Sequence, residues 1–334
     1  MYDGAPLGKF EIKGPDALNL LEMLYTSSFA SLKTGMGRCG IMLKEDGIIL
    51  DDGVTFKLAD NHYFMSTSTG HADSVNQHME FFRQVHRPEW QVRITTVTTQ
   101  WANITVCGPR AREMMQALDT ATDLSPDAFP FMAMRDTTVA GFEARLCRVS
   151  FTGELSYEIN VRARDQLALW EKVMDIGQNF DITPVGSEAN HVLRVEKGFL
   201  SLGHEADSTT DPYDLGMGWI MSDKADYIGK KAVQIRRSAG VPRRELVGLL
   251  PDDTDNLIDE NAPITPSGGR ERSEGFVTAC VWSVVLNRVI ALALLTDGRN
   301  RIGERIFIRR KNTVVTAVVT EPCFHDREGR LLRS

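Results

Sequence analysis

Residues 9–24 read KFEIKGPDALNLLEML, and residues 102–118 read ANITVCGPRAREMMQAL. Each stretch predicts a strand, then Gly-Pro, then an amphipathic helix. Proline suits the first helical turn, where its missing N–H needs no partner. Apolar residues recur at helical spacing after each proline. We therefore expect one structural unit to occur twice in the chain.

The parallel between the two copies continues downstream. The expected elements are strands Val54–Leu58 and Tyr63–Ser66 with a helix at about 71–84, and strands Leu146–Phe151 and Ser156–Val161 with a helix at about 165–177. Each copy is then strand–helix–strand–strand–helix, an α+β plan of the split-βαβ kind. Two such modules side by side leave a groove at their junction, where ligands often bind.

The pattern changes at Arg244, after which short apolar runs alternate with turn signals such as Pro266-Ser267-Gly268-Gly269. This pattern predicts a small all-β C-terminal domain. A helix near Ser187–Lys197 precedes it, and the basic runs at 236–237 and 243–244 are typical of a solvated linker. We expect modules at 1–92, 93–240 and 241–334.

Composition excludes several classes of protein. The 334 residues include 38 Lys and Arg and 45 Asp and Glu, for a net charge of −7, and 42% are hydrophobic. These are globular values, and the negative charge argues against nucleic-acid binding, which depends on phosphate neutralisation. No apolar run reaches about 18 residues, so no membrane span or membrane partner is expected. Five scattered cysteines without a CxxC argue against a disulfide framework and a zinc site, and they favour a cytoplasmic setting. The histidines form no HxxxH pattern, so no metal site is expected.

Two acidic patterns are candidates for a site. Asp51 and Asp52 end the apolar run GIILDD, where carboxylates are disfavoured. Alternation puts them on opposite strand faces, one toward solvent and one toward the groove, and the alternative is a solvated bulge. Glu158 lies within an apolar strand and needs a partner, because an unpaired buried charge is costly. An arginine or a ligand edge with two donors would serve.

Two other patterns are less informative. Arg194 and Glu196 end the helix at 187–197 but point in different directions, so either can belong to an ordinary surface pair. The run GMGRCG at 35–40 matches GxGxxG, yet a strand and a turn follow it instead of a helix. A dinucleotide site is therefore not expected there.

Five runs resemble the folate-binding aminomethyltransferase family: LGKFEIKGPDA (7–17), EDGIILDDGVT (45–55), RVSFTGELSYEINV (148–161), LRVEKGF (193–199) and DLGMGW (214–219). This family includes the glycine-cleavage T-protein, dimethylglycine dehydrogenases and the α subunit of heterotetrameric sarcosine oxidase. The resemblance is greatest to the C-terminal half of that α subunit. It implies two related α+β domains and a C-terminal antiparallel β-barrel, arranged as a ring around a central channel for tetrahydrofolate.

The resemblance implies roles for five residues. The family's catalytic aspartate matches Asp52 and not Asp51, near the N5/N10 edge of the folate, and its pterin-binding glutamate matches Glu158. Its helix arginine matches Arg194, which would shape the folate channel or pair with a carboxylate. Phe56 and Phe151 stand where the T-protein has tyrosines. They would keep aromatic walls for the folate without the hydroxyls, which favours the sarcosine oxidase branch.

The implied activity is one-carbon transfer. A flavin partner, such as the other sarcosine oxidase subunits, would oxidise sarcosine or a similar N-methyl amine to an imine, and this chain would form 5,10-methylenetetrahydrofolate from it. No nucleotide-binding half precedes this region in the 334 residues. FAD is therefore expected only on a partner chain or a missing N-terminal half. The alternatives are a free-standing aminomethyltransferase served by a lipoyl carrier protein and a non-catalytic folate-binding protein.

Overall fold

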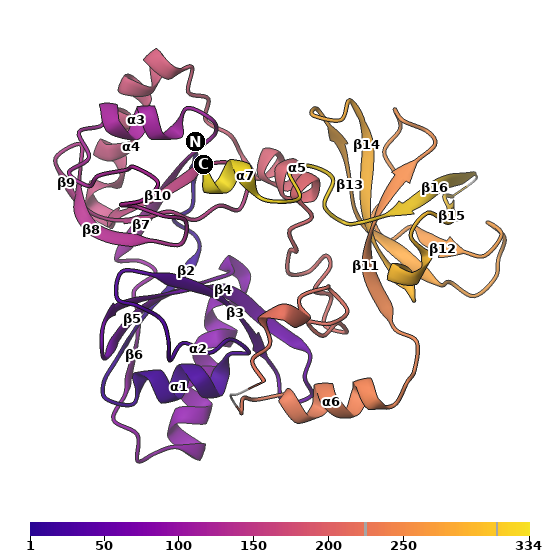
Figure 1. Ribbon diagram of the computed structural model, residues 1–334, viewed down its shortest axis with the longest axis horizontal. Helices are drawn as coiled ribbons and strands as arrows, with labels where there is room; N and C mark the ends of the chain where they lie inside the picture. Colours follow the sequence, from indigo (N-terminus) through magenta and orange to yellow (C-terminus); the bar gives the residue numbers. More distant parts are fainter. Residues whose placement is uncertain (224–225, 312) are drawn as a thin grey trace.

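The computed structural model describes residues 1–223, 226–311 and 313–334, which form three lobes (Figure 1). Two lobes are five-stranded antiparallel sheets with helices, and the third is a closed barrel. The segment that holds α5 (Ser187–Lys197) runs between them. The predicted fold class, two related α+β modules followed by an antiparallel barrel, is confirmed.

The first sheet has the strand order β3-β4-β5-β2-β6. Its strands are β2 (Gly8–Lys13), β3 (Gly37–Leu43), β4 (Ile49–Ala59), β5 (His62–Thr67) and β6 (Arg93–Thr96). Helices α1 (Ala17–Leu24) and α2 (Ala72–Phe81) bury Leu21 and Met79 against one face of this sheet.

The second sheet has the order β1-β7-β10-β9-β8. Its strands are β1 (Tyr2–Asp3), β7 (Trp101–Cys107), β8 (Met134–Val139), β9 (Phe142–Cys147) and β10 (Ser156–Arg162), and its helices are α3 (Ala111–Ala117) and α4 (Gln166–Gly177). The strand expected at Leu146–Phe151 is displaced: β9 spans Phe142–Cys147 and pairs with β8, a strand that the sequence analysis did not predict. Phe151 therefore lies in a loop.

The two copies of the predicted repeat have matching backbone geometry at their Gly-Pro turns. Gly14 and Gly108 both have positive φ angles, 134° and 125°, which favour glycine. Each carbonyl accepts the backbone N–H three residues on, at 3.0 Å. The edge strands are exchanged: β1 precedes the first copy but pairs with β7, and β6 precedes the second copy but pairs with β2. The two modules are thus joined by reciprocal strand pairing. Their division at residue 92 stays a prediction.

The barrel closes in the order β11-β14-β13-β12-β15-β16. Its strands are β11 (Arg244–Pro251), β12 (Pro263–Thr265), β13 (Gly275–Ser283), β14 (Arg288–Thr296), β15 (Arg305–Arg309) and β16 (Val314–Thr320), and α7 (Arg330–Arg333) follows. Strand β14 is apolar on both faces because one face lines the barrel and the other packs toward α5. Among the described residues, no helix is long and apolar enough to cross a membrane.

The prediction that the basic runs at 236–237 and 243–244 form a solvated linker is wrong. Helix α6 (Lys230–Ser238) carries Arg236 and Arg237, which bind the fully buried Asp211, and Arg237 and Arg243 bind the fully buried Asp214. The basic runs therefore hold the loop after α5 in place. The remaining helical turns are η1 (Thr69–His71), η2 (Phe82–His86), η3 (Ala163–Asp165), η4 (Gln178–Phe180), η5 (Gly218–Ile220) and η6 (Gly298–Arg301).

Candidate functional site

Strand register puts the two neighbouring carboxylates of β4 on opposite faces of the first sheet. Asp51 pairs with Met42, which belongs to the core beneath α1 and α2. Asp52 pairs with Ile41 and lies on the other face, because side chains alternate along a strand. Phe56 shares the face of Asp52 and packs against the second sheet. Asp52 is thus directed toward the junction of the lobes, and Asp51 toward the helices.

The expectation that one of the two carboxylates faces solvent is wrong. Asp51 is 1% exposed and Asp52 is partly buried. The strand irregularity lies at Leu50, between the pairs Met42–Asp51 and Leu43–Ile49, so the acidic pair is not a solvated bulge.

Burial changes the acidity of both groups. It raises the pKa of Asp52 to about 6, although the nearby His71 lowers it. Burial and the Asp52 charge raise the pKa of Asp51 to about 8. At pH 7 Asp52 is therefore mostly ionised and Asp51 mostly protonated.

Glu158 projects from β10 on the face of the second sheet that carries Thr105 and Cys147. Asn103 Nδ2 donates to Glu158 Oε2 at 3.0 Å, the only hydrogen bond to this carboxylate among the described residues. Burial raises the pKa of Glu158, while the Asn103 hydrogen bond and the Lys9 charge lower it. Among the described residues its neighbours are this amide and a nearby ammonium rather than an arginine, and only one of its oxygens accepts a hydrogen bond; a ligand edge with two donors stays a prediction.

Lys9 brings a cation from the first sheet to this carboxylate. Its side chain is buried, and Nζ donates to the carbonyl oxygens of Ala5 and Leu7, both at 2.9 Å. Burial lowers the pKa of Lys9 to about 8, while the charges of Glu158 and Asp3 raise it. The two lobes are thus coupled electrostatically where their sheets face each other.

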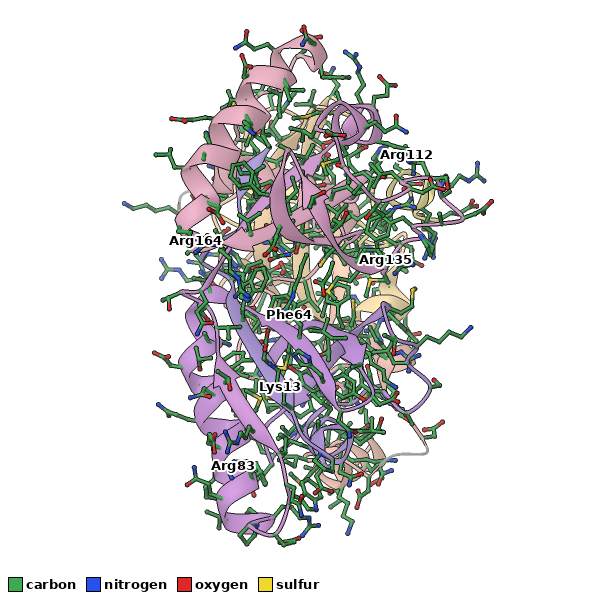
Figure 2. The ribbon with its side chains drawn as sticks, turned by 90° about the vertical axis from the view of Figure 1, so that its left-hand side faces the viewer. Lys13, Phe64, Arg83, Arg112, Arg135 and Arg164 are labelled. Atoms are coloured by element: carbon green, nitrogen blue, oxygen red, sulfur yellow. The ribbon has the colours of Figure 1, made fainter. Side chains whose placement is uncertain are left out.

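An apolar cluster joins the two facing sheets, and Phe64 marks this junction in Figure 2. Its buried members are Phe56, Phe64, Val97, Trp101, Met134, Cys147 and Val149. Arg145 also crosses the junction: its guanidinium lies over the Trp101 ring and pairs with Glu11 at 2.8 Å. Phe56 is therefore part of the apolar wall between the lobes.

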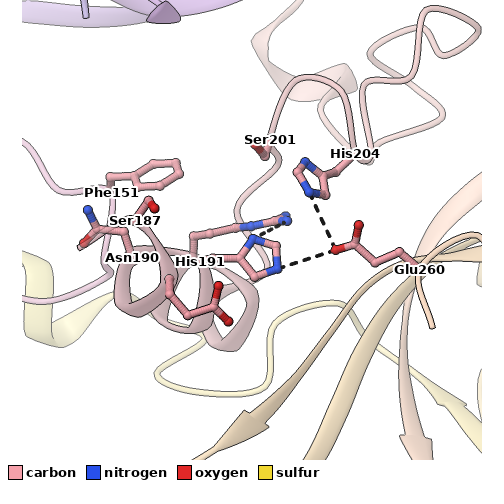
Figure 3. Close-up of a pocket in the computed structure, with 9 residues that line it drawn as sticks. Phe151, Ser187, Asn190, His191, Ser201, His204 and Glu260 are labelled. Carbon is pink, nitrogen blue, oxygen red and sulfur yellow. Dashed lines mark hydrogen bonds and ion pairs between the residues drawn. The ribbon is translucent and has the colours of Figure 1, made fainter. Parts of the chain in front are cut away.

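A pocket of about 460 Å³ lies beside α5 (Figure 3). Its lining comes from the second lobe, α5, the following loop and the barrel: Phe151, Ser187, Glu188, Asn190, His191, Arg194, Ser201, His204 and Glu260. Phe151 is 41% exposed here. Phe56 and Phe151, expected as two walls of one folate site, thus lie in different surroundings.

Arg194 is buried and forms an ion pair, so the surface alternative for this residue is wrong. Its Nη1 donates to Glu205 Oε2 at 2.6 Å, and both side chains are 1% exposed or less. Glu205 also accepts from the Ser201 N–H at 2.9 Å and the Thr278 hydroxyl at 2.8 Å. Of the two roles expected for Arg194, pairing with a carboxylate is the one found in the structure. A contact with folate stays a prediction.

Two histidines and a glutamate meet at the same pocket, although no spacing in the sequence indicates it. His191 comes from α5, His204 from the following loop, and Glu260 from the loop between β11 and β12. One ligand atom of each residue lies within 4.8 Å of the others. Burial lowers the pKa of His191, and the charges of Arg194 and His204 lower it further.

Family models match nearly the whole chain. The GCVT N-terminal domain matches residues 1–225, and the glycine cleavage T-protein C-terminal barrel domain matches residues 244–326. The second match coincides with the barrel, and the first spans both α+β lobes and the connecting segment as far as residue 225.

Individual relatives agree with these matches. Sarcosine oxidase subunit alpha of Corynebacterium sp. strain U-96 is 42% identical over 98% of this chain and 35% of its own length. Aminomethyltransferase of Alkaliphilus metalliredigens is 29% identical over 98% of this chain and 86% of its own length. The aminomethyltransferase T structure from Bartonella henselae superposes with a TM-score of 0.85 at 22% identity, over 98% of this chain and 86% of that one. The chain spans about a third of the sarcosine oxidase subunits that it matches.

Proposed function

The chain belongs to the glycine cleavage T-protein family, and from this premise we propose that it binds tetrahydrofolate and transfers a one-carbon unit to it. One observation carries the proposal. Asp52 and Glu158 are partly buried carboxylates on the faces that the two sheets turn toward each other, and few protein groups compensate their charges. Uncompensated buried carboxylates are costly unless a ligand supplies the missing donors.

Glu158 is the residue that would hold the folate. Its Oε1 has no hydrogen bond among the described residues, and only Asn103 donates to Oε2. A carboxylate can accept two parallel N–H bonds, and the pterin edge with its 2-amino group and N3–H offers two donors. Arg194, paired with Glu205, would support the wall of the site. Phe151 would offer exposed aromatic surface at the pocket, whereas the buried Phe56 would back the apolar wall between the lobes.

Asp52 is the residue that would act on the reaction. Bound folate supplies N5 and N10, the nucleophiles that take up the carbon unit. The ionised Asp52 would stabilise positive charge that develops beside it, and it would hold a proton when its carboxyl is neutral. Holding both reactants in place supplies further rate, because bound reactants behave as if at high effective molarity.

We further propose an imine made by a flavin partner as the source of the carbon unit. A flavin protein would oxidise sarcosine or a similar N-methyl amine, and the product here would be 5,10-methylenetetrahydrofolate. The higher identity to sarcosine oxidase subunits, 42% against 29% for an aminomethyltransferase, favours this source over a lipoyl carrier protein.

Binding is tested by calorimetric titration of 5-formyltetrahydrofolate, a stable reduced folate, into the full chain. Glu158→Gln keeps the shape but removes the charge that strengthens both hydrogen bonds. It should therefore weaken binding roughly 10- to 100-fold. Glu143→Gln, an exposed change on β9, is the matched control and should bind as the parent does. Equal affinity of the Glu158 variant and the control would remove Glu158 from the site.

The carbon source is tested by assaying methylenetetrahydrofolate formation with either flavin-containing sarcosine oxidase subunits or a charged lipoyl carrier protein. Formation with the flavin subunits and sarcosine supports the proposal. Formation only with the lipoyl carrier assigns a glycine-cleavage activity instead. Folate binding without product in either reaction leaves a non-catalytic folate-binding protein and refutes the transferase assignment.

A further inference from the structure

Three side chains of types that can ligate metals converge at the pocket beside α5 (Figure 3). His191 Nε2 and His204 Nε2 both point at Glu260 Oε1, at 3.9 Å and 3.7 Å. Both histidines are partly buried, with 21% and 32% of their side chains exposed. The proposed folate chemistry assigns no role to these three side chains, although Phe151 and Arg194, which it uses, line the same pocket.

We propose that His191, His204 and Glu260 form a binding site for a divalent transition metal such as Zn²⁺, with its open positions facing the pocket. Two imidazole nitrogens and a carboxylate oxygen are a common ligand set for catalytic zinc. Zinc bonds of about 2.0–2.2 Å place tetrahedral ligand atoms roughly 3.3–3.6 Å apart. The two separations from Glu260 Oε1 are 3.7 and 3.9 Å, and all three ligand atoms lie within 4.8 Å of one another, so side-chain rotations would bring them to bonding distance of one ion.

The charges around the pocket favour a cation. Glu260 and Glu188 both line it. The one arginine in the lining, Arg194, is neutralised by its ion pair with Glu205 at 2.6 Å. His204 Nδ1 is buried without a hydrogen-bond partner among the described residues, so no protein group prevents that nitrogen from carrying the proton while Nε2 binds the metal.

His191 must change one contact to bind. Arg194 Nη2 lies 3.2 Å from His191 Nδ1, and arginine can only donate, so the neutral ring carries its proton on Nε2. Coordination through Nε2 moves that proton to Nδ1 and releases Arg194 Nη2. Arg194 keeps Glu205 and the Phe199 carbonyl oxygen through Nη1. The site is therefore closed by a tautomer exchange on one residue, with no net proton uptake or release at the ring.

The test is calorimetric titration of ZnCl₂ into the full chain, with no folate present, so that its result does not depend on the proposed function. We expect one ion per chain. His204→Ala and Glu260→Gln should each weaken binding at least about 100-fold, because loss of a direct ligand exceeds the 10- to 100-fold cost of losing a supporting group. His86→Ala and Glu89→Gln are exposed matched controls and should bind as the parent does.

Two measurements distinguish this site from zinc bound at a surface thiol. Cobalt(II) bound at the site should give visible d–d bands without a thiolate charge-transfer band, and Cys39→Ser should leave zinc binding unchanged, because Cys39 is an exposed thiol. Glu260 is largely exposed, so its variant should fold even if His204→Ala does not. Absence of binding, binding that survives in both ligand variants, or binding lost in Cys39→Ser would each overturn the proposal.

Discussion

Buried carboxylates are supported in opposite ways in two regions of this molecule. In the loop after α5, Asp211 and Asp214 are fully buried and bind Arg236, Arg237 and Arg243, with distances such as 2.6 Å from Arg237 Nη2 to Asp214 Oδ1. At the junction of the sheets, Asp52 has no ion pair and Glu158 has a single amide donor among the described residues.

This difference in charge compensation distinguishes carboxylates that stabilise the fold from carboxylates that are available to a ligand. Carboxylates that pair with several arginines hold the chain in place, and removing one partner leaves the remaining charges without compensation. Carboxylates short of donors have raised pKa values, as Asp52 and Glu158 do, and their surroundings are completed only when a ligand arrives. We therefore expect variants in the first region to change stability, and variants in the second to change binding and rate.

The largest effect should come from breaking the saturated network. Asp214→Ala leaves Arg237 and Arg243 without their shared acceptor, and we expect it to lower the free energy of unfolding by about 3 kcal/mol. Urea denaturation followed by tryptophan fluorescence measures this. Glu113→Ala breaks an exposed pair and should change stability by under about 0.5 kcal/mol. A similar small change for Asp214→Ala would show that its network is no stronger than a surface pair.

Asp52→Asn should instead change the rate of one-carbon transfer. Without the negative charge beside the reacting atoms, the transfer rate should fall at least about 100-fold. Folate affinity should change less than about threefold, because this residue is not a donor or acceptor for the pterin edge in the proposed site. Steady-state kinetics and calorimetry on the same preparation separate the two. Transfer at the parent rate would show that Asp52 has no part in the reaction.

Asp51 is a third kind of buried carboxylate, because it faces the helices of the first lobe and not the junction of the sheets. Its folded pKa of about 8 lies above the ordinary 3.8, so its contribution to stability is full below about pH 4 and is lost as the pH rises through 8. Asp51→Asn removes this loss. We expect the variant to be more stable than the parent at pH 9 and equal to it at pH 4, by urea denaturation. A less stable variant at pH 9 would show that the ionised group is well compensated.

The smallest effect is the pH dependence of transfer in the unmodified chain. The pKa of Asp52 is raised to about 6, so its ionised fraction falls as the pH drops through that value. The rate under saturating substrates should fall about tenfold between pH 7 and pH 5. The residual transfer rate of the Asp52→Asn variant should not show this fall between pH 7 and pH 5. A rate that stays constant down to pH 5 would show that the ionised form is not required.

Local patterns in the sequence were sufficient for much of the fold. The two Gly-Pro turns predict the repeated strand–helix unit, because both backbones need a positive φ at the glycine. Helix α5 matches its predicted bounds, 187–197, and five of the barrel strands follow the apolar runs. The exchange of β1 and β6 between the sheets was not predictable, since both strands are short and pairing partners are not encoded in local periodicity.

The sequence by itself determined that carboxylates would interrupt the apolar strands at positions 51, 52 and 158, because a charge within such a strand is visible without coordinates. Only the tertiary structure decided which way each one points, that Arg237 and Arg243 are not a solvated linker, and that His191, His204 and Glu260 meet. The physical reason is the same in each case. Alternation and spacing fix a side chain relative to its own strand or helix, whereas charge compensation depends on partners from elements far away in the chain.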